Sequence, residues 1–217
     1  MAKVRQEAGE REKIIFKRLK KEFPEAKTAL NFSNPLQLLV STILSAQCTD
    51  VRVNMITPAL FAKYSTVNHF ALAEQHELEL DIKSTGFYHN KAKNIIGAAQ
   101  AIVKQFAGSV PQTMEELLEL PGVGRKTANC VLGGAFGIQS GIVVDTHVLR
   151  LAKRLGLTME DTPEKVEQDL LKIVPKKDWY HFSNLIILHG RKTCNARKPL
   201  CDQCNLADVC PSRKNYI

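Results

Sequence analysis

The sequence predicts an all-α protein. Its apolar residues recur mainly at spacings of three and four, which is the period of a helix with one buried face. Helix start signals precede several of these segments, and no pair of alternating polar and apolar segments predicts paired strands. No repeat of fixed period and no low-complexity linker interrupts the chain. We therefore expect helices packed on helices throughout.

The composition favours a polyanionic partner. The 217 residues include 30 Lys and Arg against 22 Asp and Glu, which gives a formal net charge of +8. Such an excess attracts nucleic acids. The first residues lack the apolar core of a secretory signal, and no apolar run reaches membrane-spanning length. We therefore expect a cytoplasmic protein with reduced cysteines and no membrane partner.

The first helices are predicted from amphipathic spacing and from caps. Residues 7–23 form a basic amphipathic pattern whose inward positions are Ile14, Ile15, Leu19 and Phe23. Asn34 followed by Pro35 is typical of an N-cap and a first-turn proline. They open an apolar helix that we expect to be buried and to reach Gln47.

The next segments are shorter. Thr49 predicts the start of another helix, and Thr57 with Pro58 predicts the start of a third. Further helical segments are expected near residues 68–83. Gly86 then breaks the pattern.

A long helix over residues 88–106, ended by Gly108, leads to a glycine hairpin. Thr113 opens a capping box with the glutamate three residues later, and Pro121 ends that helix. Gly122 and Gly124 allow backbone angles closed to other residues, and a helix restarts directly after them. Its free amides can bind a phosphate oxygen whatever the base. This arrangement predicts a grip on a nucleic-acid backbone.

Lys126 lies in the first turn of the restarted helix. Helical spacing places it away from the apolar row and beside the small residues Asn129, Cys130 and Gly133. The positive helix end and Arg125 both disfavour an ammonium there, which makes Lys126 a candidate Schiff-base nucleophile. A solvated or phosphate-pairing lysine is the commoner role, and spacing alone favours it.

Asp145 stands between a short apolar run and a helix. Aspartate commonly caps helices, and capping alone explains its presence. The intervening chain is nevertheless long enough to bring Asp145 back to Lys126. A carboxylate beside an amine can stabilise a cationic sugar and steer proton transfers. Beyond it, two more helices are expected, one between Pro163 and Pro175 and one over residues 179–189.

The second strong signal is a group of four cysteines within 17 residues: Cys194, Cys201, Cys204 and Cys210. Disulfides are not expected in a reducing compartment, and the spacing leaves both zinc and an iron-sulfur cluster open. Basic residues surround the group, including Arg197 and Lys198 in the loop after the first cysteine. We interpret a metal centre here as a clip that folds this loop against phosphates, although stabilisation of the segment alone would also explain it.

These motifs together resemble the endonuclease III family of DNA glycosylases. The resemblance is carried by Leu120 to Asn129, by Val144-Asp145-Thr146-His147 and by the cysteine spacing. It extends over nearly the whole chain and includes residues 45–50, Ser-Ala-Gln-Cys-Thr-Asp. The order and mutual spacing of these motifs are far more specific than any one of them.

The resemblance implies a bifunctional glycosylase and lyase that removes oxidised pyrimidines from damaged double-stranded DNA and then cleaves the strand by β-elimination. It implies two all-α domains with the active cleft between them. One is a six-helix barrel near residues 28–138, and the other joins 1–27 to 139–217 and holds a [4Fe-4S] cluster on the four cysteines. We further expect a monomer in a prokaryotic cytoplasm, associated with the nucleoid when bound to DNA.

The resemblance also implies roles for single residues. Lys126 matches the family's nucleophile, Asp145 its partner carboxylate, and Gln47 the glutamine that fills the space left by the extruded base. The family's wedge residue near Gly86 is often aliphatic, whereas this chain has Phe87. Other DNA contacts are expected from Gly122, Val123, Gly124, Arg125, His147, Arg197 and Lys198.

Three other functions explain less. Related adenine-mismatch glycosylases share the hairpin and the cluster, but this chain has Lys126 where they lack that lysine and no acidic residue between Asn34 and Gln47. A non-catalytic DNA-binding module would leave Lys126 and Asp145 without a shared task. An iron-sulfur electron carrier would account only for the cysteine-rich part.

Overall fold

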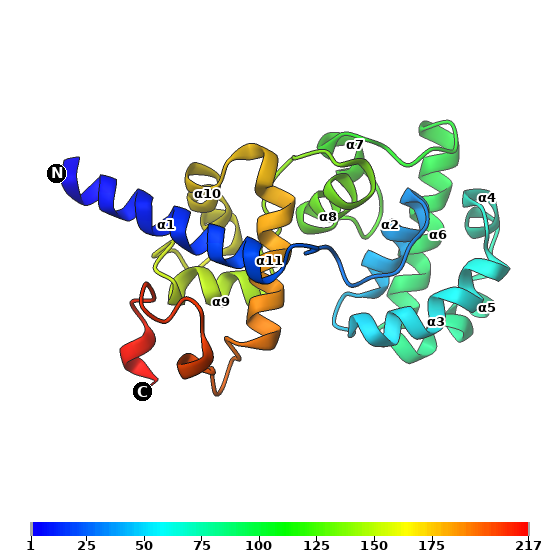
Figure 1. Ribbon diagram of the computed structural model, residues 1–217. Coiled ribbons are helices and arrows are strands. Elements are labelled where there is room, and N and C mark those ends of the chain that lie inside the picture. The colour runs from blue at the N-terminus through cyan, green and yellow to red at the C-terminus, as the bar shows by residue number, and fades with distance from the viewer. Residues whose placement is uncertain (1, 217) are drawn as a thin grey trace. The chain divides into compact units, whose positions relative to one another are not determined.

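The computed structural model describes residues 2–216, with side chains from residue 9 onward. Its regular structure over these residues consists of α-helices and 3-10 turns, with no strand, which confirms the all-α prediction. The chain divides into two compact units, Thr28–Ser140 and the pair of segments Met1–Lys27 and Gly141–Ile217 (Figure 1).

The unit Thr28–Ser140 contains seven α-helices and one 3-10 turn among the described residues. They are α2 (Pro35–Leu44), α3 (Asp50–Lys63), α4 (Val67–Ala71), α5 (Gln75–Ile82), η1 (Lys83–Thr85), α6 (Tyr88–Gln105), α7 (Met114–Leu118) and α8 (Arg125–Phe136). Several begin where a capping residue was expected, since Asn34, Thr49 and Thr113 each accept a hydrogen bond from an amide three residues later. Local capping therefore sets these helix starts.

Two predicted boundaries in this unit are wrong. Pro58 lies inside α3 and does not begin a third helix. A proline removes one backbone donor, but the burial of Thr57 and Leu60 on either side of it favours a continued helix. Helix α2 ends at Leu44 and does not reach Gln47, whose φ of 53° is not helical.

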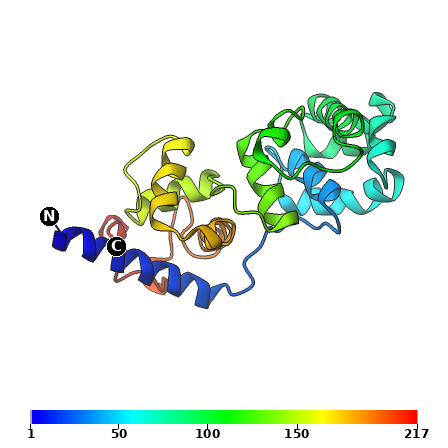
Figure 2. The same ribbon diagram turned by 90° about the horizontal axis from the view of Figure 1, so that it is seen from above.

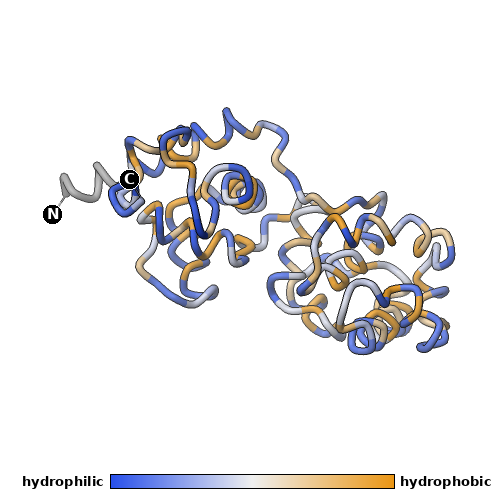
Figure 3. Tube along the Cα trace, turned by 90° about the horizontal axis from the view of Figure 1, so that it is seen from below, coloured by the Kyte–Doolittle hydropathy of each residue, from blue (hydrophilic) through white to orange (hydrophobic). Residues whose placement is uncertain are grey.

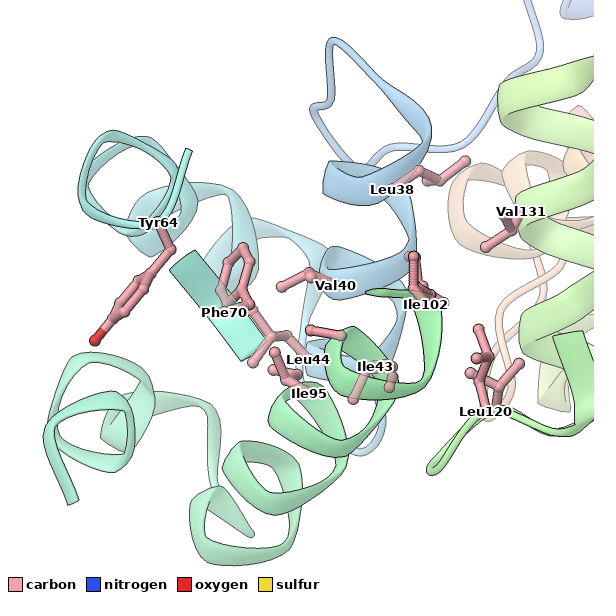
Figure 4. Packing of buried hydrophobic residues seen from close by; sticks show 14 of the residues in the cluster. Leu38, Val40, Ile43, Leu44, Tyr64, Phe70, Ile95, Ile102, Leu120 and Val131 are labelled. Atoms are coloured by element: carbon pink, nitrogen blue, oxygen red, sulfur yellow. The ribbon is translucent and has the colours of Figure 1, made fainter. Parts of the chain in front are cut away.

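The core of this unit lies among α2, α4, α6 and α8. Leu38, Leu44, Phe70, Ile102 and Val131 are almost completely buried and belong to one cluster (Figure 4). Burial of side chains of this size contributes about 1.5–3 kcal/mol each. The core therefore fixes the helices from which the hairpin and its neighbouring loops extend.

The second unit is built from both ends of the chain. Its elements are α1 (Ala2–Glu22), α9 (Thr146–Arg154), α10 (Pro163–Ile173), η2 (Lys176–Asp178), α11 (Trp179–Lys192), η3 (Cys201–Gln203) and η4 (Arg213–Asn215). Leu19 of α1 is buried with Leu151 and Leu185 in one cluster. Ile14 was expected to face inward, but it is 38% exposed, whereas Ile15 carries the contact with this core.

Polar contacts join α1 to residues near the opposite end of the chain. Arg18 donates from Nη1 to the carbonyl of Asn205 at 2.8 Å and from Nη2 to Asp208 Oδ2 at 2.9 Å. Asn205 Nδ2 donates to Glu22 Oε2 at 2.6 Å. The last part of the chain accordingly runs beside α1 (Figure 2).

Hydrophobic and hydrophilic stretches alternate along the helices (Figure 3). Among the described residues, no helix combines the length and apolar character that crossing a membrane requires.

Candidate functional site

The glycine hairpin links α7 to α8. Leu120 and Val123 are buried, and the amide of Val123 donates to the carbonyl of Leu120 at 3.1 Å. Pro121 and Gly122 between them are exposed. The buried pair anchors the hairpin from below, so its exposed part keeps a defined shape. Val123 is only 7% exposed, so the DNA contact predicted for this residue stays a prediction.

Gly122 and Gly124 have different roles. Gly122 has a φ of 77°, and a Cβ there would lie 2.7 Å from the Asn94 side chain of α6. Both observations require glycine. Gly124 has φ −97° and ψ 176°, and a Cβ would meet nothing within 4 Å. The expectation that both need special angles is therefore wrong for Gly124, whose advantage is an open approach to the amides of α8.

The N-terminus of α8 is the second component of the site. Gly124 is its N-cap and provides no side-chain hydrogen bond, so the first amides of the helix receive no cap from it. Arg125 and Lys126 are exposed there. Positive helix ends of this kind attract anions. The geometry thus offers an exposed amine directly beside a favourable position for a phosphate.

The small residues beside Lys126 do not form an open face. Asn129 is 3% exposed and its Oδ1 accepts a hydrogen bond from Ser140 at 2.7 Å. Cys130 Sγ lies 3.8 Å from Thr42 Oγ1 of α2, and burial raises the pKa of this thiol. Part of this face is therefore covered by α2.

A cavity of about 180 Å³ lies beside the hairpin within the same unit. Its lining comes from the end of α2, the loops after α2 and η1, α6, the hairpin and the first turn of α8, and includes Gln47, Phe87, Asn90, Lys91, Asn94 and Gly122. Sequence reasoning identified only some of these. Asn90, Lys91 and Asn94 look like ordinary polar residues of an amphipathic helix, so no sequence signal distinguished them.

Two residues of this cavity adopt left-handed backbone angles. Gln47 has φ 53° and Phe87 has φ 48°, and neither is a glycine. Such conformations cost on the order of 1–3 kcal/mol and persist where surrounding contacts hold them, often at functional sites. Phe87 is also 63% exposed, which is unusual for a large aromatic side chain. Gln47 and Phe87 therefore carry a side-chain amide and an aromatic ring at two tight turns of the backbone.

Asp145 belongs to the other unit and caps α9. Its Oδ1 accepts from the amide of Val148 at 2.8 Å, as the capping interpretation predicted. His147, two residues later, is half-buried. Its Nδ1 lies 3.3 Å from Arg150 Nη2. Both predicted residues thus have structural contacts within their own unit.

The four cysteines are free thiols that line one cavity, together with Arg154 and His189. Arg154 Nη1 donates to Cys194 Sγ at 3.3 Å, and the Leu206 amide donates to Cys204 Sγ at 3.4 Å. Burial raises the pKa of the Cys204 thiol.

The donor set of this cavity is four thiols, which is suited to coordinating a metal centre. Four thiolates suit a tetrahedral zinc ion as well as a [4Fe-4S] cluster, in which each thiolate binds a different iron.

Arg197 and Lys198 are exposed in the loop between the first two cysteines. Arg154, which sequence reasoning missed, holds the base of this loop. Its Nη1 donates to the carbonyl of Asn195 at 2.8 Å and its Nη2 to that of Ala196 at 2.7 Å. Arg154 thus fixes the backbone from which the two cations extend.

Comparison with known proteins gives consistent matches. Residues 40–176 match the family model described as HhH-GPD superfamily base excision DNA repair protein. The endonuclease III of Synechocystis sp. (strain ATCC 27184 / PCC 6803 / Kazusa) is 59% identical over 194 residues, covering 89% of each chain. That of Escherichia coli (strain K12) is 43% identical over 199 residues, covering 90% of this chain and 92% of the relative.

A solved structure titled as a non-covalent endonuclease III–DNA complex agrees with a TM-score of 0.91 at 42% identity, covering 95% of this chain and 97% of the other. At 21% identity, a thermostable thymine-DNA glycosylase still aligns with a TM-score of 0.85 over 96% of this chain and 99% of the other, which shows the shared fold.

Proposed function

Because the chain belongs to the endonuclease III family within the HhH-GPD superfamily, and is thus a base excision repair DNA glycosylase, we propose that it removes oxidised pyrimidines through a Schiff base and then cleaves the strand. The observation that carries this proposal is the exposed Lys126 in the first turn of α8, directly after the glycine hairpin. A binding module would need the hairpin but not this amine.

DNA is held by its backbone. The first amides of α8, together with the exposed Gly122 and Arg125, offer a position suited to a phosphate oxygen. Arg197 and Lys198 bind further phosphates from the cysteine-containing unit. These contacts set the position of the protein on the duplex without reading sequence. They explain how one protein can examine many positions.

The damaged base must leave the stack before chemistry begins, at a cost of a few kcal/mol that is lowest for damaged pairs. Gln47 enters the space that the nucleotide leaves, where its amide can both donate to and accept from the orphaned partner. Phe87 stacks beside it as the wedge. Both line the cavity beside the hairpin, so both are available from the same side.

The neutral amine of Lys126 then attacks C1′, and the bond from C1′ to the base breaks with the base taking the electron pair and a proton. The C1′–O4′ bond then breaks, with O4′ keeping its electron pair and taking a proton, and the iminium formed on the opened sugar makes C2′ acidic. Loss of a C2′ proton expels the 3′ phosphate by β-elimination, and water releases the lysine. Asp145 stabilises the cationic sugar and accepts or returns protons. Its bond to Val148 keeps the carboxylate in a fixed orientation.

Cys194, Cys201, Cys204 and Cys210 hold a [4Fe-4S] cluster in this proposal. The cluster supplies structural cross-linking of the segment that carries Arg197 and Lys198. Arg154 positions that segment through its two carbonyl contacts. The unit Thr28–Ser140 is correspondingly the barrel domain with the hairpin, and the other unit is the cluster domain.

Borohydride reduction tests the proposal. Duplex DNA containing thymine glycol, mixed with the protein and reductant, should give a covalent protein–DNA species, and peptide mapping should locate the link at Lys126. Excision without a trapped species would exclude the Schiff base. Iron and sulfide analysis, with an absorbance band near 400 nm, tests the cluster. Stoichiometric zinc without iron would refute that part.

A further inference from the structure

Lys91 of α6 is a buried lysine. It is 4% exposed, whereas Lys93 on the same helix is exposed. Lysine is almost never fully buried unless its charge has partners. The Nζ of Lys91 donates to the carbonyl of Leu44 at 2.8 Å and to that of Thr85 at 2.9 Å. Two carbonyls distant in sequence therefore share one ammonium.

Both carbonyls lie where the chain reverses. Leu44 is the last residue of α2 and Thr85 is the last residue of η1. Terminal carbonyls of helices lack a partner in the helix and must find another. An unpaired buried carbonyl costs free energy comparable to a lost hydrogen bond. Lys91 satisfies both at once and so ties the end of α2 to the end of η1.

Each tie is next to a left-handed residue. Gln47 follows Leu44 by three positions and Phe87 follows Thr85 by two, and their φ angles are 53° and 48°. The amide of Lys91 also donates to the carbonyl of Phe87 at 3.1 Å, so Lys91 holds the Phe87 reversal through both backbone and side chain. Strained conformations persist only where neighbouring contacts determine them.

We propose that Lys91 is the positioning residue that sets Gln47 and Phe87 in register, so that both enter the DNA together when the damaged base leaves the stack. This inference rests on the proposed function and adds a residue to it. Lys91 lines the same cavity as Gln47 and Phe87. Lys91 acts on the reaction only through these two side chains and transfers no proton itself.

An ammonium suits this task better than an apolar side chain. Burial lowers the pKa of Lys91, which shows that the charge is costly in this position. A methionine of similar length would avoid that cost but would leave the Leu44 and Thr85 carbonyls without donors. The two hydrogen bonds thus offset the cost of burying the charge, and an apolar side chain could not supply them.

The test compares Lys91→Met with Lys93→Met, which places the same substitution on the exposed side of the same helix. Two duplexes are used, one with thymine glycol and one with a preformed abasic site, which has no base to extrude. For Lys91→Met, the ratio of base excision to abasic-site cleavage should fall by roughly tenfold or more, because both reversals lose their tie. Lys93→Met should keep the wild-type ratio.

Lys91→Arg retains N–H donors and should recover most of the ratio. A merely structural role would lower both activities together and leave the ratio unchanged, which would overturn the proposal. Failure of both Lys91 variants to fold would likewise assign this residue to stability alone. Wild-type protein inactive on both duplexes would instead overturn the proposed function itself, so the two failures are distinguishable.

A double-mutant cycle adds a second readout. If Lys91 acts through Gln47 and Phe87, then Lys91→Met should lower the ratio by less than about twofold in a Gln47→Ala, Phe87→Ala background. An undiminished, additive loss in that background would show that Lys91 acts by another route.

Discussion

The hairpin and the cysteine segment, residues 194–210, both present groups proposed to hold DNA, but they are built differently. The hairpin stands on the buried side chains Leu120 and Val123, and Asn94 of α6 packs against Gly122. In the cysteine segment, Leu206 is the one fully buried apolar residue among those described. Its regular structure is limited to the three-residue turn η3.

The hairpin and the cysteine segment take their conformations from different sources. A hairpin anchored in a core keeps its conformation through the chain's own packing. A segment with little apolar burial needs another source of order, and metal ligation can provide one because binding free energy then becomes folding free energy. We therefore expect the hairpin to tolerate loss of the cluster and the cysteine segment to depend on it.

The largest effect should be a loss of base excision, caused by removing the proposed nucleophile beside the hairpin while leaving DNA binding intact. Lys126→Ala should lower excision of thymine glycol roughly ten-thousandfold or more and abolish the borohydride adduct, because it removes the nucleophile. DNA binding and the absorbance near 400 nm should stay. Lys104→Ala, at an exposed position of α6, is the matched control. Undiminished trapping in Lys126→Ala would move the nucleophile to another residue.

The glycines of the hairpin test how strictly packing sets its shape. Gly122→Ala should reduce the free energy of unfolding by about 2–4 kcal/mol, since it combines a left-handed φ with a clash against Asn94. Gly124→Ala meets open space and should cost less than about 1 kcal/mol, while weakening DNA binding by blocking the amides. Urea unfolding measures the first difference and fluorescence anisotropy the second. Equal stability losses would mean that the hairpin is not held as described.

Removal of one thiol tests the cysteine segment. Cys204→Ala should lose the absorbance band, expose residues near 194–210 to protease and weaken DNA binding about tenfold or more, because the loop with Arg197 and Lys198 loses its order. The unit Thr28–Ser140 should keep its proteolytic resistance. Cys48→Ala, outside this group, serves as the control. Intact protection of residues 194–210 in Cys204→Ala would show that this segment keeps its conformation without the cluster.

The smallest effect should come from the exposed cations. Arg197→Ala should weaken binding a fewfold without regard to sequence and reduce the slope of log affinity against log salt by about 0.9. Lys198→Ala should do the same. A salt titration of each variant measures this slope. Unchanged slopes in both would remove the cysteine segment from the DNA footprint.

Much of the fold was predictable because its signals are local. Asn34 and Thr113 are caps whose side chains bond within three residues, so sequence alone reveals them. Pro58 was misleading, because burial of its neighbours in the core decides whether the helix continues, and that depends on distant residues.

Some residues of the candidate site were likewise predictable from the sequence, and others were not. Gly122 is visible in the sequence through its turn chemistry, and Asp145 through its capping position. Lys91 is invisible, because its partners Leu44 and Thr85 lie elsewhere in the chain and only the folded structure shows that they meet it. Arg154 escaped notice for the same reason, since its acceptors lie about forty residues away.

The insertion of Thr28–Ser140 between the two segments of the other unit has a consequence for biosynthesis. The inserted unit leaves the ribosome complete and can fold while synthesis continues. Helix α1 must wait, because Arg18 and Glu22 find their partners only when Asn205 and Asp208 have emerged. At typical elongation rates that interval lasts about 10–40 s, during which the apolar face of α1 needs shielding.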